Sequence, residues 1–197
     1  MDQTQQYYES HAEDFFSNTI NADLTAIYQV VLRYLTQPKN LLDIGCGSGR
    51  DLANLKKYFK GDCIGIEPSQ ALAIKAKSHS GCEILTTSFL ASTIQDKFDL
   101  IWACASLLHF NEHDLIEAFK KIKQLLTPKG IVYCSFKRGD FAGLRNGRFF
   151  IDMTREKLQT HLPEDLTIKK VWYTKDVRKG VDTQWINVVL NNKNTSK

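Results

Sequence analysis

The sequence predicts an α/β fold in which a doubly wound, mostly parallel sheet of seven strands is covered by helices on both faces. Short apolar runs alternate with amphipathic stretches from about residue 40 onward, which is typical of strands joined by crossover helices. A glycine-rich turn over residues 45–49 directly follows the first apolar run and precedes a predicted helix. In sheets of this kind, such a turn is the usual place for a nucleotide.

The length of 197 residues predicts one domain, residues 1–197, with a substantial hydrophobic core. No apolar run approaches the ~20 residues that cross a membrane, and the polar start of the chain is unlike a signal peptide. The five cysteines include no C-x-x-C pair, so we expect neither a metal site nor a disulfide framework. These features predict a cytoplasmic protein with reduced thiols and no membrane partner.

Residues 1–36 are predicted to form an N-terminal helical region. Helices are expected over residues 4–18 and 20–35. The second has apolar residues at helical spacing: Leu24, Ile27, Val31, Tyr34 and Leu35. Pro38 and Asn40 are expected to end this region.

Residues 40–136 are predicted to form a core of alternating strands and helices. Helices are expected over residues 50–59, from Pro68 to about residue 78, and after Asn111, which can cap the third helix. The segment 127–130 contains proline and glycine and is expected to end that third helix. The strands are expected at residues 40–45, 63–67, 83–88, 98–104 and 131–136.

Residues 137–192 are predicted to hold a substrate loop and the last strands. A loop rich in glycine and arginine is expected over residues 137–153, followed by a helix from Thr154 to about residue 162. The last two strands are expected at residues 166–174 and 185–191. Residues 137–197 contain 13 Lys+Arg and 7 Asp+Glu, a net charge of +6. Either a solvated basic face or an anionic substrate or partner would explain this excess.

The glycine turn carries an acid just before it, and this acid narrows the choice of ligand. A dinucleotide fingerprint, G-x-G-x-x-G, would place its third glycine at position 50, where this chain has Arg50. A pyrophosphate requires N–H donors and no fixed negative charge nearby. Asp43, on the first predicted strand, instead suits a ligand that carries an ammonium or sulfonium group.

The segment from Asp43 to Gly49, with its three alternate glycines, resembles the first motif of the class I S-adenosylmethionine-dependent methyltransferases. The resemblance extends over roughly residues 1–190. It implies a Rossmann-like fold with an antiparallel last strand, and residues 1–36 as a lid over the cofactor. It also implies S-adenosylmethionine as the cofactor, S-adenosylhomocysteine as the product, and in-line methyl transfer without a metal.

Residues that follow the strands are the candidates for holding this cofactor. Glu67 ends the second strand about 20 residues after the turn, where a carboxylate can bind both ribose hydroxyls. Many family members have an aspartate at the position of Ser88, where it accepts a hydrogen bond from the adenine amino group. This chain departs from the family pattern at that contact. Arg50 either pairs with the methionine carboxylate or is an exposed residue at the start of a helix. The complete expected set is Tyr8, Asp43, Gly45, Cys46, Gly47, Gly49, Arg50, Glu67, Pro68, Ser88, Phe89 and Cys104.

Candidates for the acceptor side follow the fourth and fifth strands. His109 is either a general base or a structural histidine. The sequence after the fourth strand lacks the Asn/Asp-Pro-Pro-aromatic motif of amino-group nucleic-acid methyltransferases. The expected acceptor-binding residues are Tyr7, His11, Arg138, Arg145 and Arg148, with Arg178 and Trp185 as possible additions.

These residues predict methyl transfer to a small, anionic acceptor. An RNA or protein methyltransferase with the same cofactor site is the alternative, because basic and aromatic residues also suit single-stranded nucleic acid. A further alternative is a non-catalytic nucleotide-binding module or an NAD-dependent oxidoreductase.

Overall fold

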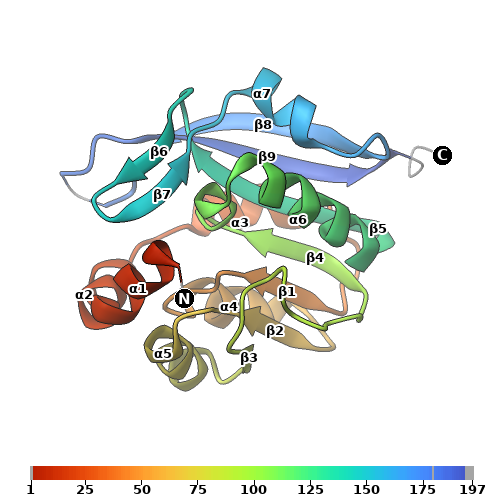
Figure 1. Cartoon of the computed structure of the whole chain (residues 1–197). Coiled ribbons are helices and arrows are strands. Elements are labelled where there is room, and N and C mark those ends of the chain that lie inside the picture. The colour runs from red at the N-terminus through yellow and green to blue at the C-terminus, as the bar shows by residue number, and fades with distance from the viewer. Residues whose placement is uncertain (1, 179, 194–197) are drawn as a thin grey trace.

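The computed structural model describes residues 2–178 and 180–193, and a seven-stranded sheet forms its centre (Figure 1). The strand order is β3-β2-β1-β4-β5-β9-β8. Strands β1 to β5 pair in parallel, whereas β9 is antiparallel to both β5 and β8. The predicted seven-stranded, mostly parallel sheet is therefore confirmed, including the antiparallel last strand. The strands are β1 (Leu41–Ile44), β2 (Cys63–Ile66), β3 (Glu83–Leu85), β4 (Phe98–Ala103), β5 (Leu126–Lys137), β8 (Leu166–Lys175) and β9 (Gln184–Asn192).

Helices cover both faces of the sheet, as expected when neighbouring side chains on each strand point to opposite faces. On one face, Leu41, Leu100 and Trp102 pack with residues of α3, α4 and α5. On the other face, Leu42 and Ile101 pack with residues of α6 and α7. The helices are α1 (Gln3–Ser10), α2 (Ala12–Thr19), α3 (Thr25–Leu32), α4 (Arg50–Leu55), α5 (Gln70–Ser80), α6 (Glu112–Leu125) and α7 (Arg155–His161), with short 3-10 turns η1 (Lys56–Tyr58) and η2 (Leu107–His109).

The N-terminal region differs from the two long helices that the sequence predicts. The expected helix over residues 4–18 is broken at His11, whose φ of −116° and ψ of 22° are not helical. The expected helix over residues 20–35 begins only at Thr25, where Asp23 Oδ1 accepts a hydrogen bond from the Thr25 amide at 2.8 Å. Such an aspartate turn competes with the helix.

The prediction of a loop over residues 137–153 was wrong, because most of this segment forms an antiparallel hairpin. Strands β6 (Ala142–Arg145) and β7 (Arg148–Ile151) are joined by Asn146 and Gly147, with φ of 50° and 77°. This Asn-Gly pair suits the type I′ turn that matches the twist of two paired strands. Strand β5 is also longer than predicted, since it begins at Leu126 and continues through Pro128.

The structure supports a stability prediction at Gly49, which begins α4 with φ of +76°. A Cβ at Gly49 would lie 2.8 Å from the Ala76 backbone, whereas a Cβ at Gly81, with φ of +65°, would meet only the end of the Lys56 side chain at 3.5 Å. We expect Gly81→Ala to lower the free energy of unfolding by about 1–2 kcal/mol through backbone strain alone. Gly49→Ala should lower the free energy of unfolding by more than Gly81→Ala does, because helix α5 must also shift. Urea unfolding of the two variants measures both losses. Equal losses would contradict this packing argument.

Candidate active site

A cavity of about 370 Å³ lies at the carboxyl ends of β1, β2 and β4, where ligands bind in doubly wound sheets. One end is lined by the glycine turn and by residues that follow β2 and β3. The other end is lined by residues from β5, the β6–β7 hairpin and the segment between β8 and β9. Helix α1 lies beside the hairpin and α5 (Figure 1) and contributes Thr4, Gln5 and Tyr8 to the lining.

The glycine turn lets a ligand approach the backbone closely. Gly45 and Gly47 have φ of +67° and +54°, and both line the cavity. A Cβ at Gly45 would lie 2.6 Å from Ser106 Cβ, so no side chain fits at this position. Ser106 Oγ is itself buried without a hydrogen-bond partner and lines the same cavity. The turn therefore offers bare backbone to the cavity.

Glu67 places a buried carboxylate on the cavity wall directly after β2. Its Oε2 accepts a hydrogen bond from the Gly47 amide, and its Oε1 accepts one from the Ser69 amide, both at 2.9 Å. Burial raises the pKa of Glu67 to about 7, against the lowering effect of these two hydrogen bonds, and the charge of Glu9 raises it further. Each oxygen retains a lone pair, so the carboxylate can accept hydrogen bonds from a ligand's hydroxyl groups.

The raised pKa of Glu67 predicts a pH dependence of stability. Between its ordinary pKa of 4.5 and its folded pKa of about 7, the folded protein holds a proton that the unfolded chain has released. The free energy of unfolding should therefore fall as pH rises through this window, by roughly 1–3 kcal/mol from Glu67. Urea unfolding from pH 4.5 to 8 should show this slope reduced in Glu67→Gln. An unchanged slope in the variant would contradict the assignment.

Asp43, the acid of the glycine motif, lies behind the cavity wall. Its side chain is buried, its Oδ2 has no hydrogen-bond partner, and it is not among the residues that line the cavity. Burial, and then the nearby charge of Asp51, raise the pKa of Asp43 well above its usual range. Its direct contact with a cationic ligand stays a prediction.

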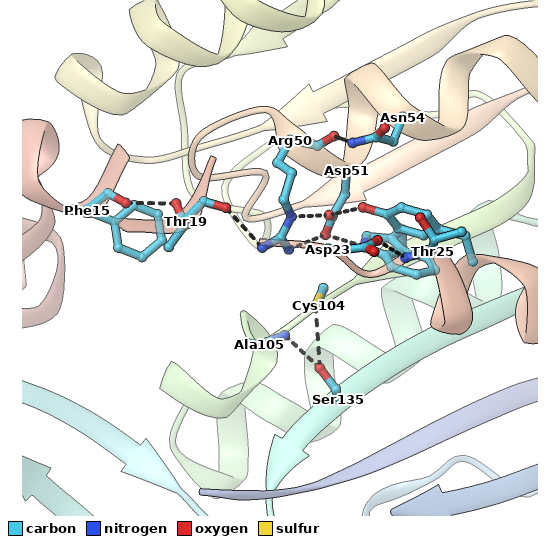
Figure 2. A network of polar contacts seen from close by, with 12 residues as sticks. Phe15, Thr19, Asp23, Thr25, Arg50, Asp51, Asn54, Cys104, Ala105 and Ser135 are labelled. Atoms are coloured by element: carbon cyan, nitrogen blue, oxygen red, sulfur yellow. Dashed lines mark hydrogen bonds and ion pairs between the residues drawn. The ribbon is translucent and has the colours of Figure 1, made fainter. Parts of the chain in front are cut away.

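Unlike Asp43, Asp51 lines the cavity, and it is not among the residues that the sequence predicts for the site. It accepts hydrogen bonds from Tyr28 Oη at 2.6 Å, from Trp102 Nε1 at 2.8 Å, and from Arg50 Nε and Nη2 at 2.6 and 3.0 Å. Burial acts to raise the pKa of Asp51, but Arg50 and these hydrogen bonds lower it overall. Figure 2 shows this network, in which Arg50 Nη1 also donates to the Thr19 carbonyl at 3.4 Å. Arg50 is therefore held in the wall rather than exposed.

The remaining residues expected near the adenine and methionine groups mostly line the cavity. Phe89 is buried there, and Ser88 Oγ accepts a hydrogen bond from the Ala91 amide at 3.3 Å. Burial raises the pKa of Cys104 to about 12, so this thiol stays protonated at neutral pH. Of the twelve expected cofactor residues, those that line the cavity are Tyr8, Gly45, Cys46, Gly47, Arg50, Glu67, Pro68, Ser88, Phe89 and Cys104.

Tyr8 and His109 form a hydrogen-bonded pair in the cavity wall. His109 Nδ1 lies 2.7 Å from the Phe149 carbonyl and must carry the proton, because a carbonyl only accepts. His109 Nε2 then accepts from Tyr8 Oη at 2.8 Å. Burial lowers the pKa of His109 to about 4, and the charges of Arg148 and Lys137 lower it further, against the hydrogen bond to Phe149. His109 is therefore neutral, and both of its ring nitrogens are occupied.

Of the predicted acceptor residues, the structure brings Arg148 into the cavity, together with Arg178 and Trp185. Tyr7, His11, Arg138 and Arg145 do not line it, which corrects their predicted grouping. Their side chains have partners elsewhere: Tyr7 stacks on His11, Arg145 pairs with Asp152 at 2.8 Å, and Arg138 donates to Gln184. Lys137, which was not predicted, lines the cavity at the end of β5.

Comparison with known proteins agrees with this geometry. Residues 41–130, which include the glycine turn and Glu67, match the family model described as "Methyltransferase domain". Residues 41–130 are therefore a methyltransferase domain of the class I S-adenosylmethionine-dependent kind. This match confirms the predicted family and cofactor, and the strand order confirms the predicted fold class.

Three known proteins are similar to this chain. An uncharacterized methyltransferase of Schizosaccharomyces pombe is 30% identical over 118 residues, which are 53% of this chain and 42% of the relative. Trans-aconitate 2-methyltransferase of Delftia acidovorans is 31% identical over 103 residues, which are 50% and 38% of the two chains. The chain thus spans about two fifths of these curated relatives. The crystal structure of N-methyltransferase NodS from Bradyrhizobium japonicum, with S-adenosyl-L-homocysteine, has a TM-score of 0.78 at 19% identity, covering 98% of this chain and 100% of that one.

Within residues 2–178 and 180–193, no helix is long and apolar enough to cross a membrane. The same residues contain no cluster of three or more His, Cys, Asp or Glu that could hold a metal ion.

Proposed function

We propose that this protein is an S-adenosylmethionine-dependent methyltransferase that acts on a small, anionic molecule. The observation that carries the proposal is the make-up of the cavity. The glycine turn and Glu67 line one end, while Lys137 and Arg148 line the other, beneath helix α1. A nucleoside cofactor and a small anion would therefore meet within one cavity.

The residues at the first end fit the cofactor. Glu67 would hold the ribose hydroxyls, the backbone of Gly45 and Gly47 would lie against the ligand, and Arg50 would pair with the methionine carboxylate. When bound, the cofactor supplies a methyl group activated by its sulfonium. The protein's own contribution is positioning, which can supply ~7–11 kcal/mol when two reactants are aligned.

The partners of the arginines favour a small acceptor over RNA. Arg145 and Arg178 are already neutralised by Asp152 and Asp176, so the β6–β7 hairpin and the end of β8 present fewer free cations than the sequence suggested. One relative supports the same choice by its name, which gives the small molecule trans-aconitate as its acceptor.

A labelled-methyl assay tests this proposal. The protein is incubated with S-adenosylmethionine carrying a radioactive methyl group and with the low-molecular-weight fraction of a cell extract. We expect label to enter small molecules, and we expect total RNA and protein from the same extract to stay unlabelled. Label in the macromolecules alone would contradict the small acceptor. No labelled product together with no binding of S-adenosylhomocysteine would contradict the enzyme assignment.

A further inference from the structure

Three cations line the cavity without an ion pair among the described residues: Lys137, Arg148 and Lys175, of which Lys175 is exposed at the end of β8. Three other arginines in or near the cavity are neutralised by the ion pairs Arg50–Asp51, Arg145–Asp152 and Arg178–Asp176, at 2.6, 2.8 and 2.7 Å. Across residues 2–178 and 180–193, no carboxylate oxygen lies within 4.0 Å of the charged nitrogens of Lys137 or Arg148. The end of the cavity that Lys137 and Arg148 line, which we call the acceptor end, therefore carries uncompensated positive charge.

The Arg148 guanidinium is held in place with donors to spare. It lies 4.3 Å from the ring centre of Tyr7 and 5.2 Å from that of Phe150, and its Nη1 donates to Tyr8 Oη at 3.3 Å. Among the described residues its Nη2 has no hydrogen-bond partner, and its Nε is buried without one. A fixed guanidinium with an unused donor is suited to a planar carboxylate, which can accept two parallel hydrogen bonds.

Lys137 contacts the same aromatic ring as Arg148 and adds to the positive charge. Its Nζ lies 4.2 Å from the centre of the Phe150 ring, which Arg148 also contacts. Burial, and then the charges of Arg145, Arg148 and Arg178, lower the pKa of Lys137. An anion at this position would relieve that repulsion, whereas an ammonium group would increase it. This charge disfavours an amine as the acceptor.

The described histidine, tyrosine and aspartate side chains at this end of the cavity already make hydrogen bonds, which disfavours them as bases toward an alcohol or a thiol. Both ring nitrogens of His109 are hydrogen-bonded, and burial lowers its pKa to about 4, which makes it a weak base, while burial raises the pKa of Tyr8. Asp176 is engaged by Arg178 and by Trp185 Nε1, and Asp2 Oδ1 caps α1 by accepting from the Gln5 amide. An acceptor that is already deprotonated at neutral pH requires no base, and a carboxylate is such a group.

We infer that the acceptor is a carboxylic acid whose carboxylate, bound by Arg148 and Lys137, is itself methylated to a methyl ester. This inference rests on the proposed methyltransferase function. One carboxylate oxygen forms a bond to the methyl carbon, the bond from that carbon to sulfur breaks, and its electron pair stays on sulfur. No proton is transferred. The negative charge of the acceptor and the positive charge of the sulfonium both disappear, so the ester loses its attraction to the two cations.

The test uses the base lability of methyl esters. The protein is incubated with radiolabelled S-adenosylmethionine and either the extract fraction or a panel of mono-, di- and tricarboxylic acids that includes trans-aconitate. Products are then treated with alkali. We expect the label to become volatile as methanol. Arg148→Met and Lys137→Met should each reduce the labelling at least tenfold, whereas Arg155→Met, an exposed residue on α7, should leave it unchanged.

Binding gives a second measurement. Every panel acid that is labelled should also raise the melting temperature of the wild-type protein saturated with S-adenosylhomocysteine, and this rise should be absent in Arg148→Met. A rise with S-adenosylhomocysteine itself should persist in each variant and show that the fold and the cofactor end are intact.

Each contrary outcome has a defined meaning. Label that resists alkali would overturn the carboxylate inference and leave the methyltransferase function standing. Full labelling by Arg148→Met would overturn the assigned subsite. The absence of label from every panel acid and from the extract would also overturn the inference, and binding of S-adenosylhomocysteine would then decide whether the proposed function fails as well.

Discussion

Replacing Asp51 with alanine is expected to lower the free energy of unfolding by about 3–5 kcal/mol, because it leaves a buried guanidinium without its counterion. The substitution removes the acceptor for Arg50, for Tyr28 Oη and for Trp102 Nε1 at once. Each buried donor without a partner adds a desolvation cost. Urea unfolding of the wild-type and variant proteins measures the difference.

The matched control is Glu117→Ala, which removes an exposed acid paired with Lys120 on the surface of α6. Surface pairs of this kind contribute less than about 1 kcal/mol, so we expect little change. If Asp51→Ala were no more destabilising than Glu117→Ala, the network in Figure 2 would not hold this wall of the cavity together.

Substitution of Glu67 by glutamine is expected to weaken binding of S-adenosylhomocysteine by roughly 10- to 100-fold. The reason is that hydrogen bonds to a charged acceptor contribute about 1.5–3 kcal/mol. Glutamine keeps the size of the side chain but replaces one carboxylate oxygen with an NH₂ group. This donor would then face the N–H of Ser69 or of Gly47, from which the carboxylate oxygen accepts a hydrogen bond. Isothermal titration calorimetry at pH 8, where the wild-type carboxylate is ionised, gives the two dissociation constants.

Glu83→Gln provides the control for this experiment, since Glu83 is an exposed acid at the start of β3 and does not line the cavity. Its affinity should match that of the wild-type protein. Equal affinity of Glu67→Gln and wild-type protein would mean that the ribose lies elsewhere.

The cofactor end could be predicted from the sequence because its signals are local. The alternate glycines, the helix that follows them and an acid at the end of the next apolar run all lie within 25 residues of one another. The role of Asp51 could not be predicted in this way, because its partners Tyr28 and Trp102 lie 23 and 51 residues away along the chain. Only the packing of α3 against the sheet brings them together.

The acceptor end was harder to predict, because its chemistry depends on which cations are neutralised. The sequence shows several arginines in the segment 137–153. It does not show that Asp152 neutralises Arg145, whereas Arg148 has no ion pair in the part of the chain that the structure describes. The β6–β7 hairpin, which carries Arg145 and Arg148, does have a local signal in the sequence, the pair Asn146 and Gly147. This pair falls within the loop that the sequence predicts. That turn sets which side chains of β7 face the cavity and the N-terminal helix.

Titration of the wild-type protein with S-adenosylhomocysteine, and separately with NAD, tests the central claim most directly. The cavity should bind one S-adenosylhomocysteine per chain, and at 100 times the dissociation constant the ligand should stabilise the fold by about 2.7 kcal/mol. NAD should produce neither heat of binding nor a rise in melting temperature. Binding of NAD with no response to S-adenosylhomocysteine would contradict the account of this site.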